Sequence, residues 1–149
     1  MELWRISNYP DLSGIGGLHA SGRWHSKGKR VVYLADHPSS ALLETLVHLE
    51  LNMIPATYQL LRVRSEKTIE VEKVEVVDLP ADWFSRIDAT RQIGDRWLDQ
   101  GSSALLQVPS AISPRATNVL LNPQHRDAML VSIVETIVPP FDPRLLKGP

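Results

Sequence analysis

The chain contains no cysteine. Disulfide bonds, thiolate nucleophiles and zinc sites with cysteine ligands are therefore excluded. Disulfides accumulate in secreted proteins and are rare in the reducing cytoplasm. The absence of cysteine therefore favours a cytoplasmic location.

Long hydrophobic runs and a surplus of either charge are also absent. No apolar stretch approaches the roughly 20 residues that a membrane-spanning helix needs, and residues 1–5 lack the basic flank and apolar run of a signal peptide. Lys and Arg total 16 against 17 Asp and Glu. This balance provides no global positive field for binding nucleic acid or a membrane, although a local basic patch is compatible with it.

The length and composition indicate one domain. With 149 residues, 43% of them hydrophobic, the chain is long enough to bury a core, and we expect a single domain over residues 1–149. Apolar runs and capping residues predict strands near residues 3–6 (at a sheet edge), 31–35, 58–64, 69–77, 104–108, 116–121 and 129–138, helices near 38–51 and 88–100, and a Gly- and Ser-rich loop over 11–29. The predicted fold class is therefore α+β, with a compact, mostly antiparallel sheet.

The first predicted helix carries a carboxylate within an apolar band. Leucine and valine occupy most of its circumference, at Leu42, Leu43, Leu46, Val47, Leu49 and Leu51, so we expect the helix to be substantially buried. Burying Glu44 costs several kcal/mol unless it is paired or faces a polar cleft. Glu44 is therefore a candidate site residue. A glutamate at the edge of the buried face, solvated or paired with a surface arginine, fits the spacing equally well.

An arginine and a tyrosine precede this helix. Arg23 lies in the segment Gly22-Arg23-Trp24-His25-Ser26-Lys27-Gly28, and Tyr33 lies in the strand that follows. Arginine presents a planar fork of donors for phosphate or carboxylate, and tyrosine presents a flat face with a polar tip. Together with a carboxylate, these groups are suited to hold a dinucleotide and cleave a glycosidic bond.

Ser110 follows a predicted strand in the second half of the chain. Its hydroxyl is placed to orient a carboxylate or bind a ligand, but for Ser110 taken alone a serine in a turn is the favoured interpretation, because no Gly-x-Ser-x-Gly motif surrounds it. Asn118 and Asn122 are expected to satisfy backbone groups in turns.

Two other chemistries are compatible with the histidines. Glu44 and His48 are four residues apart on one helix face, so a metal site with His25, His37 or Asp36 is conceivable, although a metalloprotease helix carries two histidines at this spacing. A metal-independent nuclease would use His25 and His125 as acid and base, with Arg23 and Lys27 near the phosphate.

Several motifs occur together in a characteristic order. They are Trp4-Arg5-Ile6, the segment 22–28, Val32-Tyr33-Leu34-Ala35, Ala41-Leu42-Leu43-Glu44, Ile93-Gly94-Asp95-x-Trp97, Val108-Pro109-Ser110-Ala111 and Asn118-x-Leu120-Leu121-Asn122-Pro123-x-His125. In this order they resemble the RES-domain family, which is named for an Arg, a Glu and a Ser. The resemblance covers essentially the whole chain.

The resemblance implies a toxin of a bacterial type II toxin–antitoxin pair, with a fold similar to the ADP-ribosyltransferase toxins and an activity that degrades NAD at its nicotinamide–ribose bond. The family's three catalytic residues fall on Arg23, Glu44 and Ser110. Tyr33 matches the strand tyrosine, and His25 departs from the asparagine of many relatives.

The expected substrate contacts come from Arg5, Arg23, Tyr33 and Ser110, with Arg5 as a second phosphate contact. NAD is then the substrate, and neither a cofactor nor a metal is required. The resemblance implies an Xre-type helix-turn-helix antitoxin as partner, so that DNA is reached only through the antitoxin. Homo-oligomer formation stays open.

The acceptor of the reaction is water, phosphate or a protein side chain, and the last of these would make the protein an ADP-ribosyltransferase. A nuclease and a non-catalytic binding module are the remaining alternatives.

Overall fold

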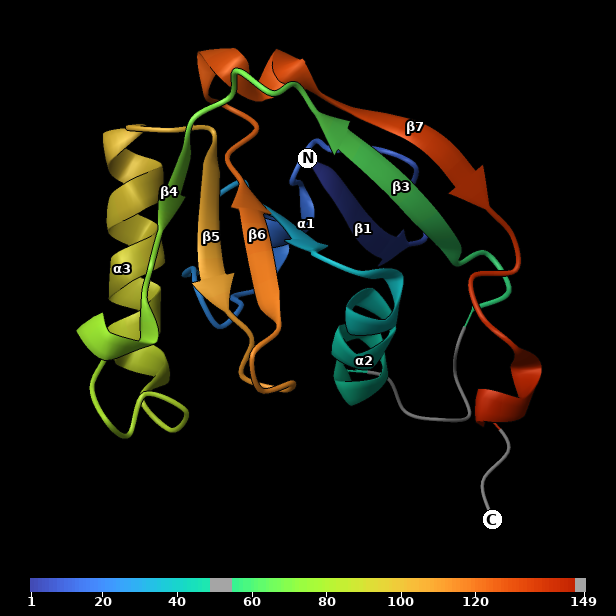
Figure 1. Ribbon diagram of the computed structural model, residues 1–149, viewed down its shortest axis with the longest axis horizontal. Helices are drawn as coiled ribbons and strands as arrows, with labels where there is room; N and C mark the ends of the chain where they lie inside the picture. The colour runs from blue at the N-terminus through green and yellow to red at the C-terminus, as the bar shows by residue number, and fades with distance from the viewer. Residues whose placement is uncertain (49–54, 147–149) are drawn as a thin grey trace.

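A seven-stranded sheet forms the frame of the protein (Figure 1). The computed structural model describes residues 1–48 and 55–146. The strands are β1 (Glu2–Ser7), β2 (Val32–Ala35), β3 (Gln59–Ser65), β4 (Val71–Lys73), β5 (Leu105–Pro109), β6 (Thr117–Leu121) and β7 (Val131–Ile137). The helices are α1 (Gly16–His19), α2 (Pro38–His48) and α3 (Ile87–Gln100), with short 3₁₀ helices η1 (Val76–Asp78), η2 (Arg126–Leu130) and η3 (Pro143–Leu146).

The strand order is β4-β5-β6-β2-β1-β3-β7. Only the β4–β5 pair is parallel, and the other neighbours are antiparallel. The predicted α+β class with a mostly antiparallel sheet is confirmed. None of the helices described is long and apolar enough to cross a membrane.

The sheet is weakly joined at its centre. β1 pairs with β3 along its whole length, whereas it meets β2 at one residue pair, Trp4 with Ala35. On either side of this junction, β5 and β6 run in a different direction from β1, β3 and β7, and α2 lies between the ends of the two groups (Figure 1). The junction therefore leaves the side chains of β1 and β2 near α2.

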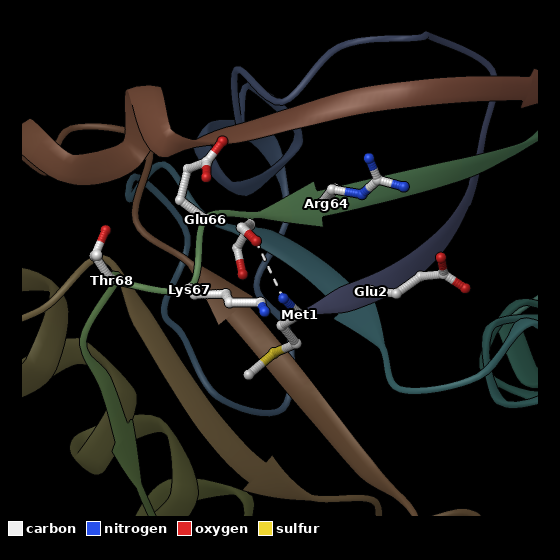
Figure 2. A pocket seen from close by; sticks show the side chains of 7 residues that line it. Met1, Glu2, Arg64, Glu66, Lys67 and Thr68 are labelled. Atoms are coloured by element: carbon white, nitrogen blue, oxygen red, sulfur yellow. Dashed lines mark hydrogen bonds between the residues drawn. The ribbon is translucent and has the colours of Figure 1, made fainter.

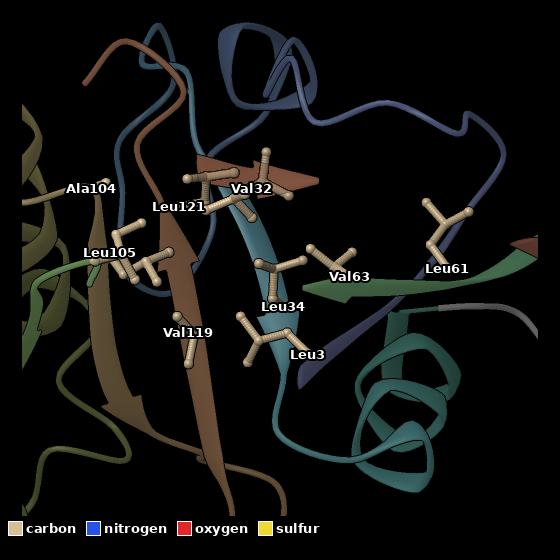
Figure 3. Close-up of a cluster of buried hydrophobic side chains, with 11 residues drawn as sticks. Leu3, Val32, Leu34, Leu61, Val63, Ala104, Leu105, Val119 and Leu121 are labelled. Carbon is tan, nitrogen blue, oxygen red and sulfur yellow. The ribbon is translucent and has the colours of Figure 1, made fainter. Parts of the chain in front are cut away.

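Buried apolar side chains form one core on each face of the sheet. Residues alternate between the two faces along a strand, and in β6 Val119 and Leu121 enter one core while Leu120 enters the other. The first core includes Leu3, Val32, Leu34, Leu61, Val63, Leu105, Val119 and Leu121 (Figure 3). The second core contains Trp24, Trp83 and Trp97 and packs α3 against the sheet.

Helix α3 holds the loop that contains Arg23. Thr90 Oγ1 donates to the carbonyl of Arg23 at 2.7 Å, and the backbone N–H of Ser26 donates to Asp95 Oδ1 at 2.8 Å. Gly94 allows the helix to approach this closely, because a Cβ at this position would overlap the carbonyl of Trp24.

Several predicted elements need correction. The strand near residues 3–6 is internal rather than at an edge, because β2 and β3 both pair with it. The strand predicted over 69–77 is limited to β4, and its apolar end turns into η1, where Val76 and Val77 are exposed. The loop over 11–29 contains the short helix α1. The predicted helix near 88–100 is confirmed, and Gly101 ends it with φ 57°.

The expectation that the helix of Glu44 is substantially buried is wrong. Helix α2 begins at Pro38 as predicted, and its predicted end at Leu51 lies outside the described residues. Of the residues of α2, only Ala41 is fully buried, while Leu43 is 43% and Val47 61% exposed. One face of α2 packs on β1 and β2. Leu43 and Val47 stay exposed, because apolar residues all round a helix cannot all reach one partner surface.

Replacing Gly94 by alanine tests the contact between α3 and the loop. We expect the Gly94→Ala protein to lose about 3 kcal/mol of unfolding free energy, because helix and loop backbones must move apart. Urea unfolding measures this loss. Gly16→Ala is the matched control, since no atom lies within 4 Å of a Cβ placed there. Equal stability of the two variants would contradict the proposed packing.

Candidate active site

A cleft of about 690 Å³ opens beside the junction of β1 and β2. Four of the predicted site residues line it: Arg5 on β1, Arg23 in the loop before β2, Tyr33 on β2 and Glu44 on α2. Ser110 is not among the lining residues but contacts Glu44. The structure therefore brings the predicted residues together, although they come from five separate segments of the chain.

The Glu44 carboxylate is held by one of its oxygens. Ser110 Oγ donates to Oε1 at 2.9 Å, and Asn118 Nδ2 donates to the same atom at 2.7 Å. Hydrogen bonds to a charged group are stronger than neutral ones. Oε2 accepts no hydrogen bond within the described part of the chain, so it is the oxygen left for a ligand.

The turn after β5 directs the Ser110 hydroxyl. Ser110 Oγ accepts from the backbone N–H groups of Ile112 at 3.2 Å and Ser113 at 3.1 Å. These bonds occupy the acceptor sites of the hydroxyl, so its own proton is available for Glu44. The two interpretations of Ser110 are both correct, because it is a turn serine that orients a carboxylate.

Arg23 is fixed at the edge of the cleft by the turn before α3. Its Nη1 donates to the carbonyl of Phe84 at 3.1 Å, and its guanidinium lies 5.9 Å from the centre of the Trp83 ring. These contacts use one of the five N–H donors of the side chain. The others have no partner among the described residues and are available to an anionic ligand.

Arg5 provides a second cation. Its Nη1 donates to the carbonyl of Asp11 at 2.9 Å. Burial lowers the pKa of the Arg5 guanidinium, and the Asp11 carboxylate partly offsets this effect. Arg91 on α3 also lines the cleft and donates from Nε to the carbonyl of Gly22 at 2.7 Å. With three arginines and Glu44 as the one acidic residue among the described lining residues, the cleft favours an anionic ligand.

The Tyr33 hydroxyl stabilises the loop at Gly22. It accepts from the N–H of Trp24 at 3.1 Å and lies 2.9 Å from His25 Nδ1, which also accepts from the N–H of Gly22 at 3.2 Å. A side chain at Gly22 would fall 2.5 Å from this hydroxyl. Burial raises the pKa of the Tyr33 phenol. The hydroxyl therefore has a structural role, and the ring of Tyr33 is the part that lines the cleft.

The histidines do not form the alternative sites. His25 is buried, and its Nε2 donates to the carbonyl of Ala20 at 3.0 Å. His125 Nδ1 accepts from the N–H of Asp127 at 3.1 Å, at the start of η2. Neither lines the cleft. Within residues 1–48 and 55–146, no group of three His, Cys, Asp or Glu side chains is placed to hold a metal ion.

A second hollow of about 470 Å³ lies around the N-terminus (Figure 2). It is lined by residues 1–2 and 64–68, and the Met1 ammonium group donates to the carbonyl of Ser65 at 3.0 Å. Its charged side chains, Glu2, Arg64, Glu66 and Lys67, are of both signs and include none of the predicted site residues.

The sequence interpretation missed two residues of the cleft, Asn118 and Arg91. Asn118 was expected to serve a turn, but it lies in β6 and binds Glu44. The signal was present, since an amide that begins a run of buried apolar residues requires a hydrogen-bond partner. No comparable signal identified Arg91, which lies on a partly exposed helix.

Comparisons with known proteins identify the family of the chain. A family profile, that of the RES domain, matches residues 2–142. The chain belongs to the RES-domain family. Arg23, Glu44 and Ser110, which the resemblance predicted as the site residues, lie at one cleft or directly behind it.

Relatives in this family have toxin names. Toxin Res of Pseudomonas putida is 48% identical over 142 residues, 93% of this chain and 97% of the relative. The Prs ADP-ribosylating toxin of a Sphingobium strain is 33% identical, over 98% of this chain and 97% of the relative. The toxin–antitoxin complex MbcT–MbcA of M. tuberculosis contains a chain with a TM-score of 0.75 at 16% identity, covering 97% of this chain and 86% of that one, which shows a shared fold.

His25 makes the stability of this RES domain dependent on pH. Burial lowers the pKa of His25 below its ordinary 6.5, so the unfolded chain binds a proton more readily than the folded one. Stability is then complete above about pH 6.5 and falls as the pH decreases from 6.5 towards the lowered value. We therefore expect the free energy of unfolding to decrease between about pH 6.5 and about pH 5.5.

Urea unfolding at about pH 7.5 and about pH 5.5 measures this loss. The His25→Asn protein retains a hydrogen-bonding side chain that does not titrate, so its stability should change less over the same interval. An equal change in both proteins would show that His25 does not titrate on unfolding.

Proposed function

We propose that the chain is a toxin that cleaves the nicotinamide–ribose bond of NAD. The proposal is carried by Glu44, whose carboxylate is fixed through Oε1 by Ser110 and Asn118 in a cleft that three arginines also line. Membership of the RES-domain family and the toxin names of its relatives support it.

The chemistry requires stabilisation of a positive charge on the ribose. When the bond between C1′ and the nicotinamide nitrogen breaks, the electron pair moves to nitrogen, and neutral nicotinamide departs. C1′ then has oxocarbenium character, which a nearby fixed carboxylate stabilises. Glu44 Oε2 supplies this negative charge. The nicotinamide ring is cationic before cleavage, so the leaving group needs no metal ion.

The arginines bind the opposite charge of the substrate. The diphosphate of NAD is anionic, and arginine forms charge-assisted hydrogen bonds with phosphate oxygens. Arg23 has N–H donors without a partner among the described residues. Arg5 adds a second cation where β1 lines the cleft. The ring of Tyr33 packs on the nicotinamide, while its hydroxyl retains its contacts with the loop.

The acceptor of the ADP-ribosyl group distinguishes three versions of the activity. Water gives a glycohydrolase and inorganic phosphate gives a phosphorylase. Transfer to a protein side chain is the second candidate, and the similarity to the Prs ADP-ribosylating toxin of Sphingobium supports it. In each case the C1′–N bond breaks with its electron pair going to nicotinamide, and the acceptor forms a new bond to C1′. A neutral acceptor such as water loses a proton in this step, whereas an ionised oxygen of phosphate loses none.

We further propose that an antitoxin binds this chain in the cytoplasm. The fold shared with a chain of the MbcT–MbcA complex supports an antitoxin partner. The Xre-type helix-turn-helix domain of that partner follows from the family resemblance.

Replacing Glu44 by glutamine tests the carboxylate. The change preserves shape and removes charge, so we expect nicotinamide release from NAD to fall at least about a hundredfold in a folded protein. Protein from cell-free synthesis and quantification of free nicotinamide provide the measurement, with circular dichroism as the test of folding. Wild-type release by folded Glu44→Gln protein would refute the mechanism, and an inactive wild type would refute the proposed function.

Arg23→Ala tests phosphate binding. We expect KM for NAD to rise on the order of tenfold, because a charge-assisted contact to the substrate is lost. Arg126→Ala is the control, since the Arg126 side chain is 89% exposed, does not line the cleft, and has its one ion pair among the described residues with its neighbour Asp127. A KM for Arg23→Ala equal to that of the control would exclude Arg23 from substrate binding.

The products of NAD labelled in its adenylate part identify the acceptor. Free ADP-ribose indicates water, a phosphorylated ADP-ribose that forms only with added phosphate indicates phosphate, and label retained on protein from a bacterial lysate indicates ADP-ribosylation. Label on protein that survives in the Glu44→Gln reaction would rule out enzymatic transfer by this site.

A further inference from the structure

Two asparagines of this chain are buried at opposite ends of β6 and differ in their contacts. Asn122 is 3% exposed, and its Oδ1 accepts from the N–H of Gln124 at 3.0 Å, as a turn asparagine does. Asn118 is 8% exposed and donates to Glu44 Oε1. Its Oδ1 is buried with no hydrogen-bond partner among the described residues.

The fold does not explain an asparagine at position 118. A buried acceptor without a partner destabilises a protein, and an apolar residue of similar size avoids this cost. The next residues of the strand, Val119, Leu120 and Leu121, are apolar and buried. The single side-chain hydrogen bond of Asn118 within the described residues is the one to Glu44, so that bond is the reason for an amide at this position.

We propose that Asn118 is a positioning residue, which anchors Glu44 by Oε1 so that Oε2 is presented to the substrate. The inference rests on the proposed function, because Glu44 is the group that it serves. The amide donates with its N–H and keeps its oxygen away from the carboxylate. With Ser110 and Asn118 both bound to Oε1, the other oxygen of the carboxylate accepts no hydrogen bond among the described residues.

The surroundings of Glu44 make this role testable by pH. The titratable side chains that line the cleft with it are Arg5 on β1, Arg23 in the loop, Tyr33 on β2, His48 on α2, Tyr58 before β3 and Arg91 on α3. None is a carboxylate. The acidic side chain of Asp36, next to β2, does not line the cleft and is bound to Thr117, which donates to its Oδ2 from the backbone N–H at 3.0 Å and from Oγ1 at 3.1 Å. An aspartate at position 118 would therefore place a carboxylate directly against Glu44.

The experiment compares Asn118→Asp, Asn118→Leu and the control Asn122→Asp by the pH–rate profile of nicotinamide release from NAD. In Asn118→Asp two adjacent carboxylates share a proton, so the acid limb of the profile should move to higher pH by about one unit or more. In Asn118→Leu we expect kcat to fall about tenfold or more with little change in KM. Asn122→Asp preserves the acceptor for Gln124 and should keep the wild-type profile.

A second measurement is independent of catalysis. NMR titration of the Glu44 side-chain carbon in isotope-labelled protein reports the midpoint of its protonation, which should move upward in Asn118→Asp and stay unchanged in Asn122→Asp. If the wild type releases no nicotinamide, the proposed function fails, and this titration alone decides the role of Asn118.

Three results would overturn the proposal. The first is a wild-type pH profile and kcat in a folded Asn118→Asp protein. The second is an unmoved Glu44 midpoint in that protein. The third is an Asn118→Leu protein whose kcat equals that of the wild type, because Asn118 would then be merely structural. This third result decides the question if the Asn118→Asp protein does not fold.

Discussion

Two hydrogen bonds to one oxygen of the Glu44 carboxylate join helix α2 to the β5–β6 side of the sheet at the cleft. Glu44 projects from α2, while its donors, Ser110 and Asn118, belong to the turn after β5 and to β6. Helix α2 is half-exposed and therefore contributes few buried contacts of its own. The contacts of Glu44 add to the packing of α2 on β1 and β2, and they also decide which oxygen of the carboxylate remains for a substrate.

The cationic side of the cleft depends on a separate set of contacts. Helix α3 approaches the loop of Arg23 at Gly94, binds its backbone through Thr90, Arg91 and Asp95, and leaves the Arg23 side chain against Trp83 and Phe84. Tyr33 and His25 stabilise the same loop from the sheet. Carboxylate and guanidinium are thus fixed by different elements and meet where β1 and β2 are joined by one residue pair. Separate supports explain why the family motifs are scattered along the whole sequence.

The sequence predicted which residues gather at the cleft better than it predicted the contacts that support them. Arg23, Glu44, Tyr33 and Ser110 were identified from residue type and family resemblance, and the strands and α3 were predicted from apolar runs and from the stop at Gly101. Asn118 was misinterpreted because a polar residue near turn signals has the same local pattern whether it serves a turn or a distant carboxylate. The exposed face of α2 and the internal position of β1 depend on which surfaces meet in three dimensions, and local periodicity carries no information about that.

The central claim is that the protein consumes NAD by means of the Glu44 carboxylate. The intracellular NAD concentration tests this claim most directly. Wild-type chain and Glu44→Gln are induced briefly in a bacterial host while growth is followed. We expect NAD to fall rapidly with growth arrest in the wild type and to stay constant with Glu44→Gln. Growth arrest at a constant NAD concentration, or an equal fall with both proteins, would contradict the account.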